Sequence, residues 1–181
     1  MNALGRHIAI SIEAAEAGKA SLALQHAAIS IDITAQRFKA GVRSKPDEIE
    51  QLLSDYLWLV DMMMVEGEGP NRMPLPLPAL SHAVRLGLVY ADGAPANASF
   101  SQEGLFEIGM GKALIPRRLI WALVAVAVFC RCNIGDHLDG RHWLALFGNR
   151  FVIDQFMGQE DVARIVHAHF LKTHAPAASA V

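Results

Sequence analysis

The chain has 181 residues and a mass of 19.7 kDa, which suits one domain with its own hydrophobic core and is short for two domains. Hydrophobic residues make up 52% of the chain and charged residues 19%, so the composition predicts a packed protein and excludes a mostly disordered one. The formal net charge of −2 excludes a strong overall field for nucleic acid or anionic lipid, so any such partner must meet a local patch.

Cysteine usage and hydropathy indicate the cellular compartment of the protein. Cys130 and Cys132 are too few and too close in sequence to cross-link a secreted fold. Arg6 and Glu13 interrupt the apolar residues near the N-terminus, so the pattern of a signal peptide is missing. The longest apolar run, residues 119–130, is far shorter than the roughly 20 residues that a membrane span needs. We therefore expect a cytoplasmic protein with no membrane contact.

The N-terminal part of the sequence predicts three helices. Apolar residues recur at helical spacing over residues 3–40 and are interrupted near Gly18, which indicates two consecutive helices. Ser44 offers an N-cap oxygen, and Pro46 suits the first turn of a third helix, where its missing N–H costs nothing. This third helix is expected to run to about Val65, with an apolar stripe wide enough to lie inside a bundle.

The middle of the chain is rich in glycine and proline. Residues 67–78 contain six of these residues and predict an extended crossover without helix or central strand. Residues 80–89 return to a short helical pattern, and residues 91–101 are expected to form a loop. We assign no element to residues 100–115, because three glycines weaken a helix there.

The most apolar helix of the chain is expected over residues 117–132, begun by Pro116, and should lie at the centre of the fold. Further along, Gly148-Asn149 separates two apolar runs, residues 142–147 and 150–156, and therefore predicts a tight β-hairpin turn.

A final amphipathic helix is expected over residues 159–172. The fold class predicted from these elements is mainly α: a single-domain bundle of about six helices with one C-terminal β-hairpin. We expect one helical domain over residues 1–174 and a disordered tail over residues 175–181. We also expect a homodimer, because an all-apolar helix flanked by arginines fits the core of a dimer.

Residues 131–142 form the densest polar cluster and directly follow the apolar helix. A zinc site there would use Cys130, Cys132, His137 and His142, but structural zinc sites usually space paired cysteines two to four residues apart. Only one residue separates this pair, and no phosphate-binding glycine loop is present in the sequence. We therefore expect no metal ion and no other cofactor.

A second interpretation of this cluster uses Arg131 and His137. A guanidinium can grip a phosphate with two donors, and an imidazole can move a proton near neutral pH. Such a pair can cut RNA without a metal, because the 2′-hydroxyl of the RNA is the nucleophile. Six residues of straight helix turn through about 240°, so the pair needs a helix break at Gly135 or a second subunit. Otherwise Arg131 is a helix C-terminal cation and His137 a loop residue.

Residues 131–137 resemble the motif of HEPN proteins, in which an arginine is followed by four to six residues and a histidine. These proteins are small all-α bundles of bacterial toxin–antitoxin and defence systems, and several are metal-independent ribonucleases that act as dimers. Residues 27–36 and 119–128 are similar to the second helix and the central apolar segment of one HEPN-like group, so the resemblance extends loosely over residues 20–170.

In that group the segment matching residues 83–90 usually ends in histidine, so the resemblance makes Arg85 the motif arginine and puts Tyr90 in the histidine's place. A tyrosine with a pKa near 10 is a poor general base at neutral pH. Either Arg131 and His137 are the catalytic pair, or the protein has the HEPN fold but does not cleave RNA.

The function predicted first is HEPN-type RNA cleavage or RNA binding in bacterial defence or stress, with no metal. Arg131 or Arg85 would contact the phosphate, and His137 would transfer the proton. One alternative is a non-enzymatic homodimer that binds a protein partner through residues 70–78 or a methionine-rich helix end. Another alternative is a small-molecule-binding helical domain, with an apolar pocket near Trp58, Met62 and Trp121.

Overall fold

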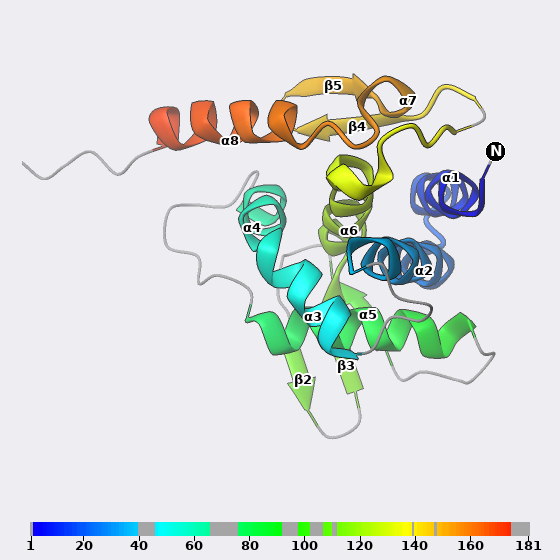
Figure 1. Ribbon diagram of the computed structural model, residues 1–181. Helices are drawn as coiled ribbons and strands as arrows, with labels where there is room; N and C mark the ends of the chain where they lie inside the picture. The colour runs from blue at the N-terminus through cyan, green and yellow to red at the C-terminus, as the bar shows by residue number, and fades with distance from the viewer. Residues whose placement is uncertain are drawn as a thin grey trace, which may run out of the picture.

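The computed structural model describes residues 2–39, 46–65, 76–91, 98–101, 107–109, 112–138, 140–146 and 148–174. The fold is mainly helical, as predicted (Figure 1). Its helices are α1 (Ala3–Glu16), α2 (Ala20–Phe38), α3 (Pro46–Asp55), α4 (Leu57–Val65), α5 (Leu77–Ala91), α6 (Arg117–Phe129), the 3-10 turn η1 (Arg131–Asn133), α7 (Ile153–Phe156) and α8 (Glu160–His174). Its strands are β1 (Ala98–Ser101), β2 (Glu107–Gly109), β3 (Lys112–Pro116), β4 (Trp143–Leu146) and β5 (Asn149–Val152).

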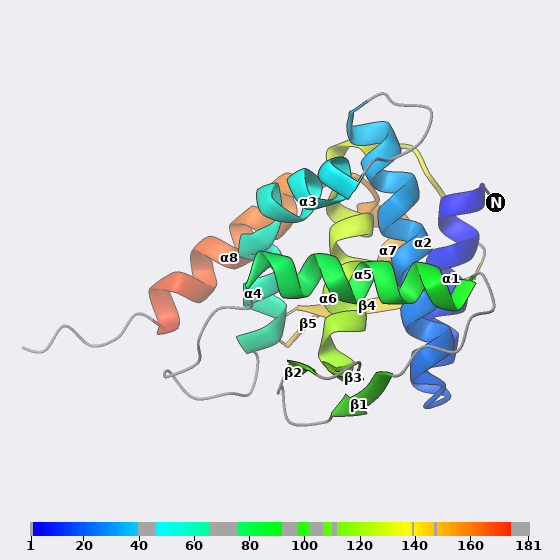
Figure 2. The same ribbon diagram turned by 90° about the horizontal axis from the view of Figure 1, so that it is seen from below.

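Helix α6 is the centre of the fold, which confirms the prediction from its composition. From Leu119 to Phe129 every side chain except that of Trp121 is buried. Helices α2 and α4 pack along it, and both views place α6 between α5 on one side and the layer of β4, β5 and α7 on the other (Figures 1 and 2). The helix ends at Phe129, three residues earlier than predicted, because the backbone of Cys130 is extended (φ −61°, ψ 125°).

Helices α1 and α2 confirm the predicted pair and its break. Gly18 adopts a positive φ of 73°, a conformation that favours glycine and allows the chain to reverse. Asn2 caps α1, because its side chain accepts a hydrogen bond from the backbone N–H of Gly5 at 2.8 Å.

The predicted third helix is in fact two helices, α3 and α4, which meet at Tyr56. The prediction of one continuous helix was wrong, and the burial of the Tyr56 side chain gives the reason. Its hydroxyl reaches into the interior to Glu160, at the start of α8. The break lets the buried helix α4 take a direction different from that of the amphipathic helix α3 (Figure 1). The predicted cap Ser44 lies outside the described residues.

The region between α5 and α6 differs most from the prediction. Helix α5 begins at Leu77, so residues 77–78 are helical rather than extended; Pro78 stands in the first turn, where proline is tolerated. The rest of the expected crossover lies mostly outside the described residues. The expected loop at residues 98–101 is strand β1, which pairs in parallel with β3, while β2 pairs with β3 antiparallel. These strands have only three to five residues, which is too short for an alternation of apolar and polar residues to be recognised in the sequence.

The C-terminal hairpin is confirmed with a shifted turn. Strands β4 and β5 are antiparallel and close at the pair Leu146 and Asn149, so Asn149 belongs to the strand rather than to the turn. Strand β5 ends at Val152, and the predicted strand residues 153–156 form helix α7. The final helix is confirmed as α8. Within the described ranges, no helix has the length and hydropathy of a membrane span. Residues 175–181 lie outside the described residues.

Candidate functional site

Arg131 and His137 are both exposed, but each has its own carboxylate partner. The Arg131 Nε atom lies 2.9 Å from Oε2 of Glu160 in α8, and the Arg131 side chain is 67% exposed. The His137 Nδ1 atom lies 3.3 Å from Oδ1 of Asp154 in α7, and the His137 side chain is 73% exposed. In the described part of the chain, no hydrogen bond or ion pair joins Arg131 to His137.

The chain between these two residues is not a straight helix. Helix α6 stops at Phe129, η1 makes one tight turn, and Gly135 follows with a positive φ of 85°. The divergence expected along a continuous helix therefore does not apply to Arg131 and His137.

Arg85 and Tyr90 lie on α5, on the other side of α6 from α7 and α8 (Figures 1 and 2). Because Arg131 and His137 are bound to residues of α8 and α7, one copy of the chain keeps Arg85 apart from them. Arg85 is exposed, and the side chain of Tyr90 lies outside the described residues.

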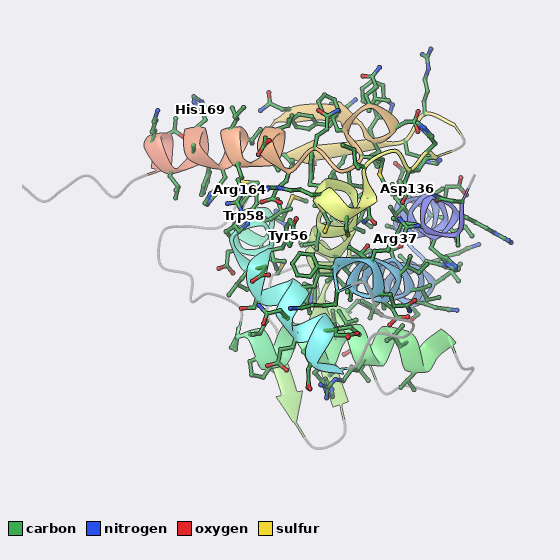
Figure 3. All side chains as sticks on the ribbon, viewed as in Figure 1. Arg37, Tyr56, Trp58, Asp136, Arg164 and His169 are labelled. Carbon is green, nitrogen blue, oxygen red and sulfur yellow. The ribbon has the colours of Figure 1, made fainter. Side chains whose placement is uncertain are left out.

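Glu160 is the centre of a polar network that joins Tyr56, at the junction of α3 and α4, to α8. Tyr56, Trp58 and Arg164 are labelled in Figure 3. The side chain of Glu160 is 7% exposed and accepts hydrogen bonds from Tyr56 Oη at 2.7 Å and from Arg164 Nε at 2.6 Å, besides the ion pair with Arg131. Burial alone would raise the pKa of Glu160, but the hydrogen bonds from Tyr56 and Arg164 and the charges of both arginines hold that pKa below its usual value. Arg164 also stacks on the Trp58 ring, 4.8 Å from its centroid.

A second network holds the turn after η1. Arg37 of α2 forms an ion pair with Asp136, which also accepts a hydrogen bond from Asn2. The fully buried Asn133 donates to Thr34 Oγ1 at 2.9 Å. These partners are far apart in sequence, so sequence patterns did not identify them.

The four residues considered for zinc do not converge. Cys130 and Cys132 lie together, with 3.1 Å between their Sγ atoms. His137 contacts Asp154, and His142 lies 4.0 Å from Glu13. Across the described ranges, no three histidine, cysteine, aspartate or glutamate side chains gather as metal ligands.

A cleft of about 410 Å³ lies where the N-terminal half of α6 meets the β4–β5 hairpin. Helix α6 contributes Arg118 and Trp121, and the hairpin contributes Trp143 and Arg150. In register, Arg150 stands opposite Ala145, so the hairpin presents one arginine and one tryptophan from the same face. The cleft is completed by Glu16 of α1, Met63 of α4 and Ala145.

The polar groups of the cleft favour an anion. The Nη1 atom of Arg118 is buried and has no hydrogen-bond partner among the described residues. The lining carries two arginines against the single carboxylate of Glu16. Pro116 caps α6 without a side-chain hydrogen bond, and the first turn of α6 contains no acidic residue, so its positive helix end is not neutralised within the helix.

The comparisons with known proteins identify the family. A family model matches residues 3–176, nearly the whole chain. The chain belongs to the Rv1289 family. No curated protein and no solved structure matches it. The matched segment contains every residue of the cleft and of the Glu160 network.

In this member of the Rv1289 family, the cleft differs from the pocket that the sequence suggested. Trp121 lines it as expected, but the methionine of the lining is Met63 and not Met62. Trp58 packs against Tyr56 and Arg164 instead. Trp143 and Arg150 were missed, although the predicted hairpin would have placed them on facing strands.

Proposed function

We propose that this protein binds a small planar anion in the cleft, namely an aromatic ring that carries a carboxylate or a phosphate ester. The single observation that carries the proposal is that Arg118, whose Nη1 atom is buried and unpartnered, lines the same cleft as Trp121 and Trp143. This is the small-molecule-binding alternative, with the ligand class now specified by the lining residues.

The energetics favour an occupied cleft. A buried donor without a partner costs about 1–3 kcal/mol, and a ligand anion that accepts from Arg118 would remove this cost. Two indole rings offer flat apolar surfaces against which an aromatic ring can pack. The volume of about 410 Å³ falls in the range of about 300–1,000 Å³ that is usual for small-molecule sites.

The test uses matched pairs of probes that differ only in charge: indole-3-carboxylate against indole, and adenosine monophosphate against adenosine. Binding is measured by the shift in melting temperature and by quenching of tryptophan fluorescence. The charged member of at least one pair should bind more tightly, and Arg118→Gln should weaken that binding about 10- to 100-fold, the effect of losing a charge-assisted hydrogen bond.

Arg141→Gln is the matched control, because Arg141 is exposed and does not line the cleft. It should leave binding unchanged. Equal binding of charged and neutral probes, or equal loss of binding in the two variants, would contradict the proposal.

The second candidate function is metal-independent RNA cleavage of the HEPN type by a homodimer. Its support is the end of α6 at Phe129, which removes the straight-helix divergence, together with the exposure of Arg131 and His137. In this reaction Arg131 would contact the phosphate and His137 would transfer the proton. Arg131 would then have to share its guanidinium between Glu160 and the RNA.

The corresponding experiment incubates the purified protein with single-stranded RNA and a chelator, and follows the products on a gel. Cleavage should occur and should be lost in His137→Ala but kept in His169→Ala, which removes another exposed histidine. Light scattering on the same samples tests the dimer. Absence of cleavage, or cleavage that survives the His137 substitution, would exclude this candidate.

A further inference from the structure

The two cysteines of the chain lie directly against each other. Cys130 directly follows α6 and Cys132 lies in η1, and their Sγ atoms are 3.1 Å apart. Residues two apart on a regular helix point in different directions. Here the extended backbone of Cys130 and the tight turn of η1 bring both side chains to the same side. A disulfide bond of about 2.05 Å requires the sulfurs to approach by only about 1 Å more.

The two sulfurs differ in access and share a proton. Cys130 is fully buried, whereas Cys132 is half-buried and its sulfur also lies 3.6 Å from the carbonyl oxygen of Thr34. The hydrogen bond from Cys132 lowers the pKa of Cys130 to about 7, and the same hydrogen bond raises the pKa of Cys132. The pair therefore holds a single proton over much of the range above neutral pH, and reacts as a unit.

We propose that Cys130 and Cys132 are a reversible redox site that forms an intramolecular disulfide with a low-molecular-weight disulfide as the oxidant. The shared proton rests on Cys132, but only the half-buried Cys132 sulfur is accessible. It attacks one sulfur of the small disulfide as its proton passes to Cys130, and the first small thiolate is released. The Cys130 sulfur then attacks Cys132 Sγ and releases the second small thiolate. The single proton leaves Cys130 as its sulfur attacks and is taken up by one of the small thiolates, so one protein thiol, one protein thiolate and one small disulfide give one protein disulfide, one small thiol and one small thiolate.

The location gives this oxidation a structural consequence. Arg131 is the residue between the two cysteines, and its backbone N–H lies 3.4 Å from the Tyr56 hydroxyl that also contacts Glu160. Drawing the sulfurs together moves the backbone of residue 131. We therefore expect oxidation to alter the contact between Arg131 and Glu160, on the opposite side of the fold from α5.

The test equilibrates the full-length protein in buffers of defined oxidised-to-reduced glutathione ratio, followed by acid quenching, alkylation and intact-mass measurement. The wild-type chain should lose two hydrogens, remain a single chain on a non-reducing gel, and return to the dithiol when the ratio is reversed. Thiols that stay free at every ratio, or a disulfide that joins two chains, would overturn the proposal.

Two variants test the order of attack. Cys130→Ser should stop at one glutathione adduct on Cys132, because the resolving sulfur is gone. Cys132→Ser should take up no glutathione under the same conditions, because only the buried sulfur remains. An adduct on Cys130 in the second variant, or none on Cys132 in the first, would overturn the assigned roles, while the wild-type measurement tests the disulfide itself even where a variant is poorly folded.

Discussion

Tyr56 and Glu160 are 104 positions apart in the sequence and form one buried hydrogen bond, in which the Tyr56 hydroxyl donates to Glu160 Oε2 at 2.7 Å. The tyrosine stands where α3 ends and α4 begins, and the glutamate is the first residue of α8. This bond therefore ties the start of the projecting helix α8 to the bundle (Figure 1). Arg131 and Arg164 contact the same carboxylate.

The first prediction concerns Tyr56→Phe, which removes the hydroxyl and keeps the ring. Glu160 then loses a neutral donor in a buried site, and hydrogen bonds to charged groups contribute about 1.5–3 kcal/mol. The free energy of unfolding, measured by urea titration, should fall by about this amount. Gln51→Ala, which removes an exposed hydrogen bond to Asp55 within α3, should change it by less than about 0.5 kcal/mol. Similar losses in both variants would contradict the prediction.

Acid stability should depend on Glu160. Burial by itself raises the pKa of Glu160, but the hydrogen bonds from Tyr56 and Arg164 and the arginine charges give a net lowering from 4.5. A lowered folded-state pKa means that the stabilisation is present above about pH 4.5 and is lost as the pH falls through the folded-state value. Chemical unfolding between pH 7 and pH 3 should therefore show a smaller acid loss in Glu160→Gln than in the wild type.

The neighbouring Asp161→Asn is the control for this titration, because Asp161 is 89% exposed and lies only at the edge of the network. Its acid loss should match that of the wild type. If Glu160→Gln and the wild type lose stability in parallel, then the ionised form of Glu160 does not stabilise the folded protein.

The sequence was informative where a signal is local. Gly18 marked the break between α1 and α2, the apolar run after Pro116 marked the central helix, and the Gly148 region marked the hairpin. It was uninformative where structure depends on distant partners. The break at Tyr56 coincides with its contact to the distant Glu160. The short sheet of β1, β3 and β2 depends on pairing between strands that carry little patterning of their own.

The candidate site follows the same division. Arg131 and His137 were found because they are close in sequence, and their carboxylate partners Glu160 and Asp154 were missed because they are not. The cleft is assembled from α1, α4, α6 and the hairpin, so no local pattern contains it.

The histidine pair between α1 and α2 should make the fold sensitive to mild acid. His7 and His26 stack with their Nδ1 atoms 2.8 Å apart, so one ring must donate and the other accept. Burial lowers the pKa of both histidines, and the charge of Arg6 adds to the lowering. Unfolded histidines take up protons below about pH 6.5, so the free energy of unfolding should fall as the pH drops below that value.

His26→Gln removes one of the two coupled groups and should reduce the stability loss between about pH 7.5 and pH 5, a window above that of Glu160. The exposed His169 provides the comparison, and His169→Gln should keep the wild-type pH dependence. The measurement is the urea midpoint across this range, and an unchanged slope in His26→Gln would show that the pair does not control it.

Among the left-handed glycines that the structure describes, Gly158 should be the least replaceable. Its φ is +76°, and a Cβ atom there would lie 2.5 Å from both the Cα and the backbone nitrogen of Ile134. Gly148 has a similar φ of +72° but no atom within 4 Å of the added Cβ, so it is a matched control for the conformational cost alone. Gly148→Ala should cost about 1–2 kcal/mol from the left-handed backbone. Gly158→Ala should add a further 1–3 kcal/mol, roughly the cost of overpacking, because backbone atoms cannot move aside as a side chain can. Urea unfolding of both variants measures the difference, and equal destabilisation would mean that the close approach of residue 158 to the turn after η1 is not a constraint on the fold.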